Sequence, residues 1–292
     1  MGTILSFGAV TMAWGHRRYV HQAETLAISI KRHMPDIPIA LLSDAAIVPR
    51  IFDDHRRIDP SHGLGVMQKL WLNQYSPFDH TLYIDSDSIV TRPFHQELEK
   101  IQQFEFTPIM GTFLGPEDTD DMFVEDLGKA MLMVGAAQFP KFNGGVYFFR
   151  KGRASDEIFE EARGIARKAA SLGLKPFDKA GPADETVVAL ALGKLGVRSF
   201  YYDDGRLMRT PIGLSGRLTI DVLGGGTAFV KHAILVTPAI CHFAAPYARY
   251  WPYFYNSFVM RHPHSGNIER FLVKQFFRIQ RRIINRMNGQ DY

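Results

Sequence analysis

The sequence has few of the features that mark secreted, membrane-spanning or repetitive proteins. Cys241 is the only cysteine among 292 residues, so an internal disulfide is impossible and a reducing compartment is expected. No apolar run approaches the length of a transmembrane helix, and there is no internal repeat or low-complexity tract. We therefore expect one globular domain that works in the cytoplasm.

The first residues also lack the charged, apolar and small-residue parts of a secretory signal peptide. The start "MGTILS" fits the pattern of an N-myristoylation site, but "TILSFGAV" reads as a first core strand, which we favour.

Acidic and basic residues are nearly balanced over most of the chain. The net charge of +4 comes from the C-terminal end, where Arg and Lys far outnumber the single Glu269 between Arg261 and Arg286. A basic tail on a slightly acidic body is weak support for nucleic-acid binding, which we do not expect.

Hydrophobic residues make up 46% and charged residues 22% of the chain, which is typical of a globular protein with a large core. Apolar periodicity predicts strands that alternate with helices. The expected strands are 3–10, 37–44, 80–87, 106–113 and 142–150, and the expected helices are 19–34, 67–76, a short one after Pro93, 155–173 and 184–196. This order predicts the α/β class, with a mostly parallel central sheet flanked by helices and ligands at the carboxyl ends of its strands.

The stretch "TLYIDSDSIV" places two aspartates at the end of an apolar strand. Because side chains alternate along a strand, Asp85 and Asp87 project to one side and Ser86 to the other. Two neighbouring carboxylates need a cation, protonation or solvent, and oxygen ligands of this kind suit Mg²⁺ or Mn²⁺ bound together with substrate phosphates. On the residues alone, the alternative is that Asp85 caps a turn and Asp87 is solvated.

Five motifs, in order from residue 3 to about residue 251, resemble the GT-A glycosyltransferases, especially glycosyltransferase family 8 and its glycogenin-like members. The motifs are "GHRRYVHQAETLAISIKRHMPDIPIALLSD", "MQKLWLNQYSPFDHTLYIDSDSIV", "FNGGVYFFRKG", "ADETVVALAL" and "HFAAPYARYW". They look like that family's nucleotide-binding unit, its lysine-bearing helix with the metal-binding DxD strand, its FNSGV segment, its GDQ-type segment and its late histidine segment. The resemblance implies a single GT-A (Rossmann-like) domain, which we place over 1–260, and the basic segment 261–292 after it is expected to form a C-terminal helix.

The resemblance also implies a metal site and a donor site. The metal ion, Mn²⁺ or Mg²⁺, is expected on Asp85, Asp87 and His242, although a lone histidine after an apolar strand can also be a hydrogen-bonded core residue. A nucleoside-diphosphate sugar, with UDP as the nucleotide, is expected on Ala9, Val10, Tyr19, Lys69, Ser86, Asp87 and Arg249.

Catalytic roles are implied for Lys69, Asn143 and Asp184. In such a site Lys69 contacts the sugar or phosphates of the donor, Asn143 binds sugar hydroxyls and Asp184 lines the transferred sugar. On the residues alone, Lys69 can be a surface lysine, and Tyr19 can hold the start of a helix rather than stack on uracil. Asp184 and Glu185 can simply favour the positive end of their helix.

Two positions depart from the pattern of the family. Glu185 stands where the family has glutamine, and "HFAAPYARYW" has Ala245 in place of a glycine and lacks the lysine that serves the diphosphate. Arg249 is the nearest cation and can replace that lysine through a bidentate phosphate contact.

Together these features predict a metal-dependent hexosyltransferase that moves a sugar from a UDP-linked donor to a glycan, protein or lipid-linked acceptor, with retention of configuration as in family 8. One alternative is a catalytically silent module of the same fold that binds a nucleotide sugar or a glycan. Another is a haloacid-dehalogenase-type phosphatase, but its Asp-x-Asp belongs to the opening strand, whereas a whole strand-helix-strand unit precedes Asp85. Residues 110–139 and 203–232 are glycine-rich or irregular and are the expected acceptor loops.

Apolar residues that recur three or four positions apart predict a basic amphipathic helix near the C-terminus. Its stripe contains Ile268, Leu272, Phe276, Ile279, Ile283 and Met287, and the cations Arg270, Lys274, Arg278, Arg281 and Arg282 fall largely off it. Such a helix can lie on an anionic membrane surface close to a lipid-linked acceptor. It can also dock on the domain, because Phe271 and Phe277 widen the apolar face.

Overall fold

The structure, a computed structural model, describes residues 6–119, 122–178, 181–244, 248 and 251–287. The chain divides into two compact units. Unit 1 contains Met1–Val20, Ile37–Asp85 and His95–Asp203, and unit 2 contains His21–Asp36, Ser86–Phe94 and Asp204–Tyr292. The chain thus passes from unit 1 to unit 2 directly after Asp85.

Unit 1 is built on a seven-stranded sheet with the order β10-β6-β7-β4-β1-β2-β3. The strands are β1 (Phe7–Ala13), β2 (Ile39–Ser43), β3 (Asp54–Arg57), β4 (His80–Ile84), β6 (Phe106–Leu114), β7 (Phe139–Arg150) and β10 (Tyr201–Tyr202). β7 runs antiparallel to β4 and β6, and the other four pairings are parallel. The predicted α/β class with a mostly parallel sheet is confirmed.

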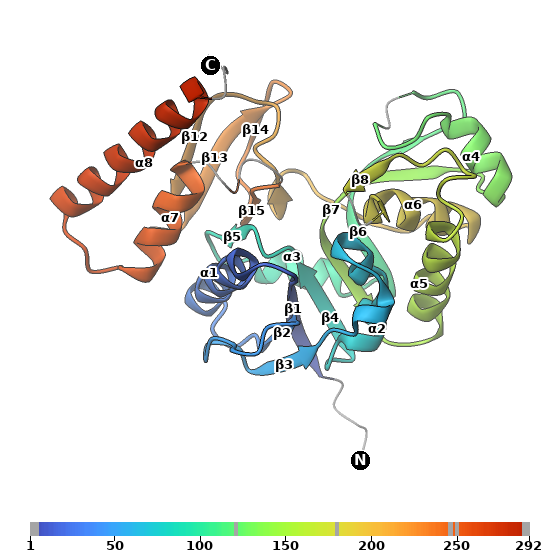
Figure 1. Cartoon of the computed structure of the whole chain (residues 1–292), viewed down its shortest axis with the longest axis horizontal. Coiled ribbons are helices and arrows are strands. Elements are labelled where there is room, and N and C mark those ends of the chain that lie inside the picture. Colours follow the sequence, from blue (N-terminus) through green and yellow to red (C-terminus); the bar gives the residue numbers. More distant parts are fainter. Residues whose placement is uncertain (1–5, 120–121, 179–180, 245–247, 249–250, 288–292) are drawn as a thin grey trace. The chain divides into compact units, whose positions relative to one another are not determined.

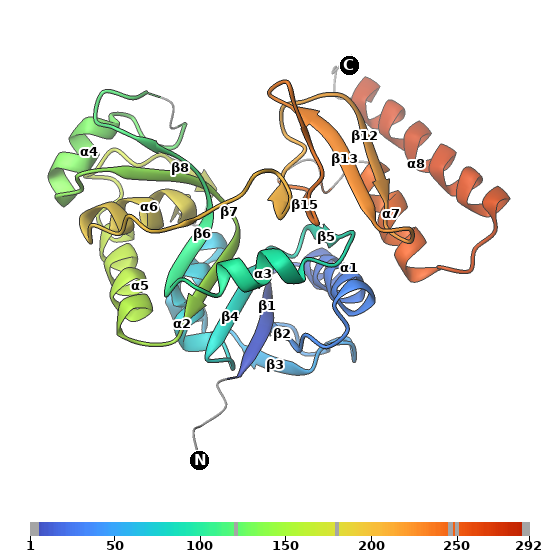
Figure 2. The ribbon, with the colours of Figure 1, turned by 180° about the vertical axis from the view of Figure 1, so that it is seen from behind.

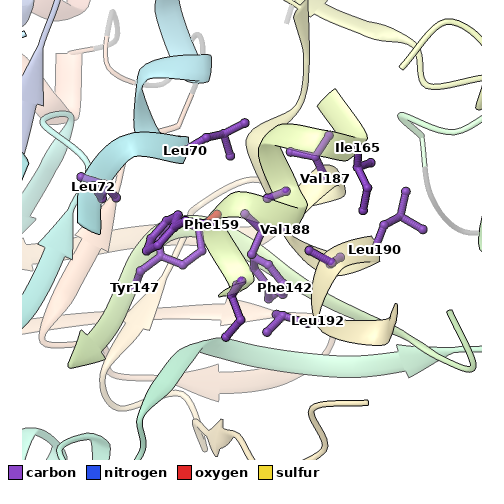
Figure 3. Packing of buried hydrophobic residues seen from close by; sticks show 14 of the residues in the cluster. Leu70, Leu72, Phe142, Tyr147, Phe159, Ile165, Val187, Val188, Leu190 and Leu192 are labelled. Carbon is purple, nitrogen blue, oxygen red and sulfur yellow. The ribbon is translucent and has the colours of Figure 1, made fainter. Parts of the chain in front are cut away.

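The helices α5 (Arg153–Ala166) and α6 (Asp184–Lys194) lie side by side next to β7 (Figures 1 and 2). α6 is buried almost all round, as expected for a helix with apolar residues on every face. Tyr147 of β7, Phe159 of α5 and Val188 of α6 lie in one apolar cluster (Figure 3). This packing holds the first turn of α6, where Asp184 stands, against β7.

Shorter elements complete unit 1. They are η1 (Pro60–His62), η2 (Gly65–Trp71), α2 (Leu72–Tyr75), α3 (His95–Ile101), α4 (Leu127–Val134), β8 (Pro176–Asp178) and β9 (Gly181–Pro182). The helix α1 (Arg17–His33) begins in unit 1 and continues in unit 2.

Besides the larger part of α1, the described residues of unit 2 contain two small sheets and two further helices. One sheet has the order β11-β15-β5, from β11 (Met208–Arg209), β15 (Ile240–His242) and β5 (Ser88–Val90). The other is antiparallel, from β12 (Leu214–Asp221), β13 (Gly226–Lys231) and β14 (Ile234–Val236). The helices α7 (Trp251–Arg261) and α8 (Asn267–Met287) lie next to each other (Figure 1).

Several boundaries differ from the sequence prediction. The first strand spans residues 7–13 and not 3–10, and residues 1–5 lie outside the described part of the chain. The single helix expected over 67–76 is a 3₁₀ segment, η2, followed by the short α2, because Trp71 leaves the helical conformation with φ −115° and ψ 12°. The segments expected to be irregular, 110–139 and 203–232, contain α4 and the β12–β13 pair.

α8 packs on α7 with one side and leaves the predicted apolar stripe in solvent. Phe277 of α8 stacks on Phe254 of α7, with ring centroids 5.5 Å apart. The exposed apolar residues of α8 are Ile268 (79%), Phe271 (59%), Leu272 (60%), Phe276 (61%) and Ile279 (53%). The side chains of Ile283 and Met287 lie outside the described part.

No helix within the described residues is both long and apolar enough to cross a membrane. The predicted division into a domain over 1–260 and a tail over 261–292 stays a prediction, and its boundary falls at the end of α7, which is Arg261.

Candidate metal and donor site

Lys69 and Asp85 form a largely buried ion pair in unit 1. Lys69 lies on η2, Asp85 follows the last residue of β4, and Lys69 Nζ is 2.8 Å from Asp85 Oδ1 with only 11% of the lysine side chain exposed. The hydroxyl of Tyr83, two residues earlier on β4, donates a hydrogen bond of 2.5 Å to the same oxygen. A surface role for Lys69 is therefore wrong, because its ammonium is held beside the DxD motif.

Lys69 also contacts Asp184 at the start of α6. Its Nζ lies 3.3 Å from Asp184 Oδ2 and donates to the carbonyl oxygen of Gly144 at 3.3 Å. The hydroxyl of Tyr147 donates to Asp184 Oδ2 at 3.0 Å. Burial raises the pKa of Asp184, the Lys69 ammonium opposes this rise, and the Asp85 carboxylate adds to it. Burial, and then the charge of Asp184, raise the pKa of Tyr147, so the phenol remains a hydrogen-bond donor at neutral pH.

The strand β7 is irregular where it faces this cluster. On β6, Pro108 pairs with Tyr147 and the next residue, Ile109, pairs with Asn143, so residues 144–146 have no partner in that ladder. Such a bulge bends a strand and re-aims its side chains, and bulges are common next to active sites. The "NGG" motif therefore lies where the pairing of β7 with β6 is interrupted, next to the first turn of α6.

Gly144 is required at this interruption. A Cβ atom at this position would lie 2.8 Å from Asp184 Oδ2 and 3.0 Å from the Tyr147 hydroxyl oxygen. The Gly144 N–H donates to Glu185 Oε2 at 2.7 Å, and the Gly145 N–H donates to Asn143 Oδ1 at 3.1 Å. Both acidic residues of α6 thus hold neighbouring chain in place, in addition to any interaction with the helix dipole.

In unit 2, the antiparallel pairing of β5 and β15 brings Asp87 and His242 together. His242 pairs with Ser88, the residue after Asp87. His242 Nε2 lies 3.1 Å from Asp87 Oδ1, and the histidine is 4% exposed. The Phe243 N–H donates to the carbonyl oxygen of Asp87 at 3.0 Å, which fixes the chain on both sides of the pair.

Asp85, Asp87 and His242 each offer one ligand atom and form a group that could hold a metal ion. Only Ser86 separates the two aspartates, so the covalent chain itself keeps them near each other. Two carboxylates and one imidazole form a mixed oxygen and nitrogen set, which suits Mn²⁺, and Mg²⁺ through the oxygens. The residues present therefore fit a divalent cation.

The residues expected to bind the nucleotide do not all lie at the carboxyl end of a strand. Ala9 and Val10 lie inside β1 and are each 1% exposed, whereas the carboxyl end of the strand is Ala13. Beyond that end, the Gly15 N–H lies 3.2 Å from the Asp44 carboxylate, which follows β2.

Tyr19 is half-buried, and the neighbouring Arg18 covers it: the guanidinium carbon lies 4.6 Å from the ring centroid and one of its nitrogens donates to the Tyr19 hydroxyl at 2.7 Å. Ser86 is 8% exposed and lies between two more exposed aspartates, but β4 ends at Ile84 and residues 86–87 form a turn, so the strand expected over 80–87 stops before the two aspartates. Ala245 and Arg249 lie outside the described residues.

A scan against protein-family models gives no match, and a search of curated proteins gives none either. Solved structures do match. The chain is similar to the galactosyltransferase LgtC in complex with donor and acceptor sugar analogues, with 18% identity and a TM-score of 0.50 over 82% of this chain and 87% of that one. It is also similar to the apo form of the bifunctional glycosyltransferase WbbM, with 11% identity and a TM-score of 0.51 over 92% of this chain and 52% of that one. The chain has a glycosyltransferase fold.

The GT-A fold that the five motifs predict is therefore confirmed. At identities of 18% and 11%, the likeness carries the fold, and the donor, metal and acceptor are argued from the site itself.

Sequence reasoning missed the two phenols that donate hydrogen bonds to Asp85 and Asp184. The contact of Tyr83 could have been predicted from the sequence, because alternation along β4 places Tyr83 on the same side as Asp85. The contact of Tyr147 could not, because the interruption of β7 at residues 144–146 breaks the alternation between Asn143 and Tyr147.

Proposed function

We propose that the protein is a metal-dependent glycosyltransferase that moves a sugar from a UDP-linked donor to an acceptor with retention of configuration. The observation that carries the proposal is the contact between Asp87 and His242, at 3.1 Å, directly after Asp85 in a glycosyltransferase fold. Carboxylate oxygens and a neutral imidazole at the end of a buried strand favour a divalent cation that also binds a diphosphate.

Asp85, Asp87 and His242 would hold Mn²⁺ or Mg²⁺, with Ser86 beside the bound donor. Bound there, the ion would act as a Lewis acid that stabilises negative charge on the departing nucleoside diphosphate. Lys69 places a further positive charge 2.8 Å from Asp85, where it orients that carboxylate. Arg249 stays our proposed replacement for the missing late lysine.

The transferred sugar is proposed to lie against Asn143, Gly144 and Asp184. Gly144 leaves the backbone open to a close ligand, and the Asn143 amide can bind sugar hydroxyls. Asp184 is fixed by Lys69 and Tyr147, so its carboxylate is oriented before the donor arrives. We name no catalytic nucleophile.

The nucleobase is proposed to bind beyond the carboxyl end of β1, where Trp14 follows Ala13 and Tyr19 opens α1. Ligands of open α/β sheets collect at such strand ends. In this arrangement Ala9 and Val10 support the site from within the strand, and the base contacts the residues that follow them.

A screen of nucleotide sugars for Mn²⁺-dependent release of nucleoside diphosphate tests the proposal. Release from a UDP-sugar that stops when EDTA is added supports the enzyme. Tight binding of the same donor without release supports the silent module of the same fold. Metal-dependent hydrolysis of a phosphate monoester, with every nucleotide sugar intact, supports the phosphatase instead, although the likeness to two glycosyltransferases favours the transferase.

We further propose that the enzyme works in the cytoplasm with α8 on an anionic membrane surface, close to a lipid-linked acceptor. The exposed apolar residues of α8, such as Leu272 and Phe276, lie on a helix whose sequence is strongly basic. Apolar residues that enter a bilayer interface beside cations that face anionic headgroups are typical of a membrane-surface helix. Docking of Phe277 on α7 is compatible with this contact, because it uses another side of the helix.

A further inference from the structure

Unit 2 contains a hollow of about 430 Å³ that none of the roles above uses. Its walls come from β12, from Phe243 after β15, from the first turns of α7 and from Lys274 of α8. A hollow of this volume falls within the range of small-ligand pockets, about 300–1,000 Å³. It can therefore take one or two sugar rings.

The charge of the walls favours an anionic ligand. Arg217 of β12 and Lys274 of α8 line the hollow, and none of the described residues that line it is acidic. Arg217 is exposed and Lys274 half-buried, so both cations are near solvent and within reach of an incoming ligand. A neutral ligand would offer neither Arg217 nor Lys274 a group of opposite charge.

The walls also carry two aromatic rings, Trp251 and Tyr255 of α7. The Lys274 ammonium lies 5.6 Å from the centroid of each ring, so the cation is held over the aromatic faces and does not extend freely into solvent. Aromatic side chains offer a rigid apolar face together with a polar tip, which suits a sugar ring with its apolar face and hydroxyl edge. Aromatic and cationic walls together select a ring that carries an acidic group.

The hollow begins one residue away from the candidate metal site. Phe243 lines it, and the preceding residue is His242, which contacts Asp87 at 3.1 Å. The Phe243 N–H is itself bonded to the Asp87 carbonyl oxygen. The hollow and the candidate metal residues of unit 2 therefore share one chain segment, with consecutive side chains on its two sides.

We propose that this hollow is the acceptor site and that the acceptor is an acidic glycan, whose terminal sugars carry a carboxylate or a phosphate group. The inference rests on the proposed function, because it calls the bound glycan an acceptor. The acidic group pairs with Arg217 and Lys274, and the sugar ring lies on Trp251.

Binding of simple sugar probes to the full chain tests the proposal without any turnover. The probes are methyl glucuronide and glucose 6-phosphate, with methyl glucoside as the neutral partner, each followed by ligand-observed NMR and by tryptophan fluorescence. The variants are Arg217→Gln and Lys274→Gln. Arg270→Gln is the matched control, because it removes the same charge one turn earlier on α8 from a residue that does not line the hollow and donates to Ser265 and Pro263 instead.

At least one acidic probe should bind, and methyl glucoside should bind at least tenfold more weakly. Each pocket variant should weaken the acidic probe about tenfold, as the loss of one charge-assisted hydrogen bond predicts, while Arg270→Gln stays within about twofold. Preference for the glucuronide or for the phosphate identifies the acidic group.

Two results would overturn the acceptor site. One is equal binding of the neutral and acidic probes, or equal loss in all three variants, since either shows that the cations of the hollow do not select the ligand. The other is displacement of the acidic probe by UDP with Mn²⁺, because the hollow would then belong to the donor. Binding of UDP with Mn²⁺ in the absence of any acidic-probe binding rejects this inference alone, whereas acidic-probe binding without any UDP binding rejects the proposed transferase and leaves a glycan-binding hollow.

Discussion

The ammonium group of Lys69 lies 2.8 Å from the carboxylate of Asp85, although the two residues come from different elements, η2 and the end of β4. The same ammonium lies 3.3 Å from Asp184, so one buried cation holds the half-buried Asp85 and the buried Asp184 in position. This arrangement ties the DxD motif to the start of α6 before any ligand binds.

Lys69→Met should destabilise the protein strongly, because it removes the cation shared by the buried Asp184 and the half-buried Asp85. We expect a loss of about 3 kcal/mol in the free energy of unfolding, measured by urea titration. Lys194→Met is the matched control: Lys194 pairs with Glu161 at 2.7 Å, but its side chain is 41% exposed. The control should lose less than about 1 kcal/mol. Equal losses in the two variants would contradict a structural role for the Lys69 network.

Asn143→Ala and Asp184→Asn should lower the turnover of the donor and leave UDP affinity nearly unchanged. Both residues are assigned to the sugar, and the contacts to the nucleotide remain in the variants. Turnover is measured as release of UDP, and affinity by calorimetry with UDP and Mn²⁺. If UDP itself binds much more weakly to both variants, the assignment to the sugar is wrong.

Gly144→Ala should impair the site even though it adds only one methyl group. The new Cβ would lie 2.8 Å from Asp184 Oδ2, and crowding of this kind costs about 1–3 kcal/mol. Turnover should fall together with the melting temperature. Gly266→Ala is the control, since a Cβ there meets no atom within 4 Å, and it should leave both quantities unchanged. A fully active Gly144→Ala enzyme would mean that Asp184 need not be held where the structure has it.

Phe276→Ser together with Ile279→Ser should abolish binding of the full chain to anionic vesicles. Both side chains are exposed in the structure, and each contributes roughly 1.5–3 kcal/mol when it enters an apolar phase. The parent should sediment with vesicles that contain phosphatidylglycerol, less so at high salt, and not with neutral vesicles.

Gln280→Ser on the same helix is the control for this surface and should bind like the parent, because Gln280 is exposed and polar. Substitutions are preferable to truncation, which would uncover the face of α7 that Phe277 covers. Sedimentation of the double variant equal to that of the parent would show that α8 is not the membrane contact.

The sequence predicted the sheet well, because its strands are apolar runs separated by helical periodicity. The neighbours β1, β2 and β4 are almost fully buried, and such strands read as continuous apolar stretches. β12 and β13 were missed for the opposite reason. β12 is largely exposed and contains Gly216, so its pattern resembles a loop.

Within the site, the sequence predicted residues whose chemistry is visible in one chain segment, such as Asp85 and Asp87. It did not predict that Tyr147 would bond to Asp184 or Glu185 to the Gly144 N–H, because these contacts depend on how β7 and α6 pack. It also placed the end of the first strand too early, which is why the buried Ala9 and Val10 were expected near the nucleobase.

Calorimetry of UDP binding in the presence and absence of Mn²⁺ tests the central claim most directly. The parent should bind UDP with Mn²⁺ and lose this binding in EDTA. Asp87→Asn and His242→Ala should lose it as well, whereas Asp36→Asn, a change at an exposed aspartate, should bind like the parent. Tight binding of UDP without metal, or unchanged affinity in Asp87→Asn, would contradict a metal-dependent donor site on Asp85, Asp87 and His242.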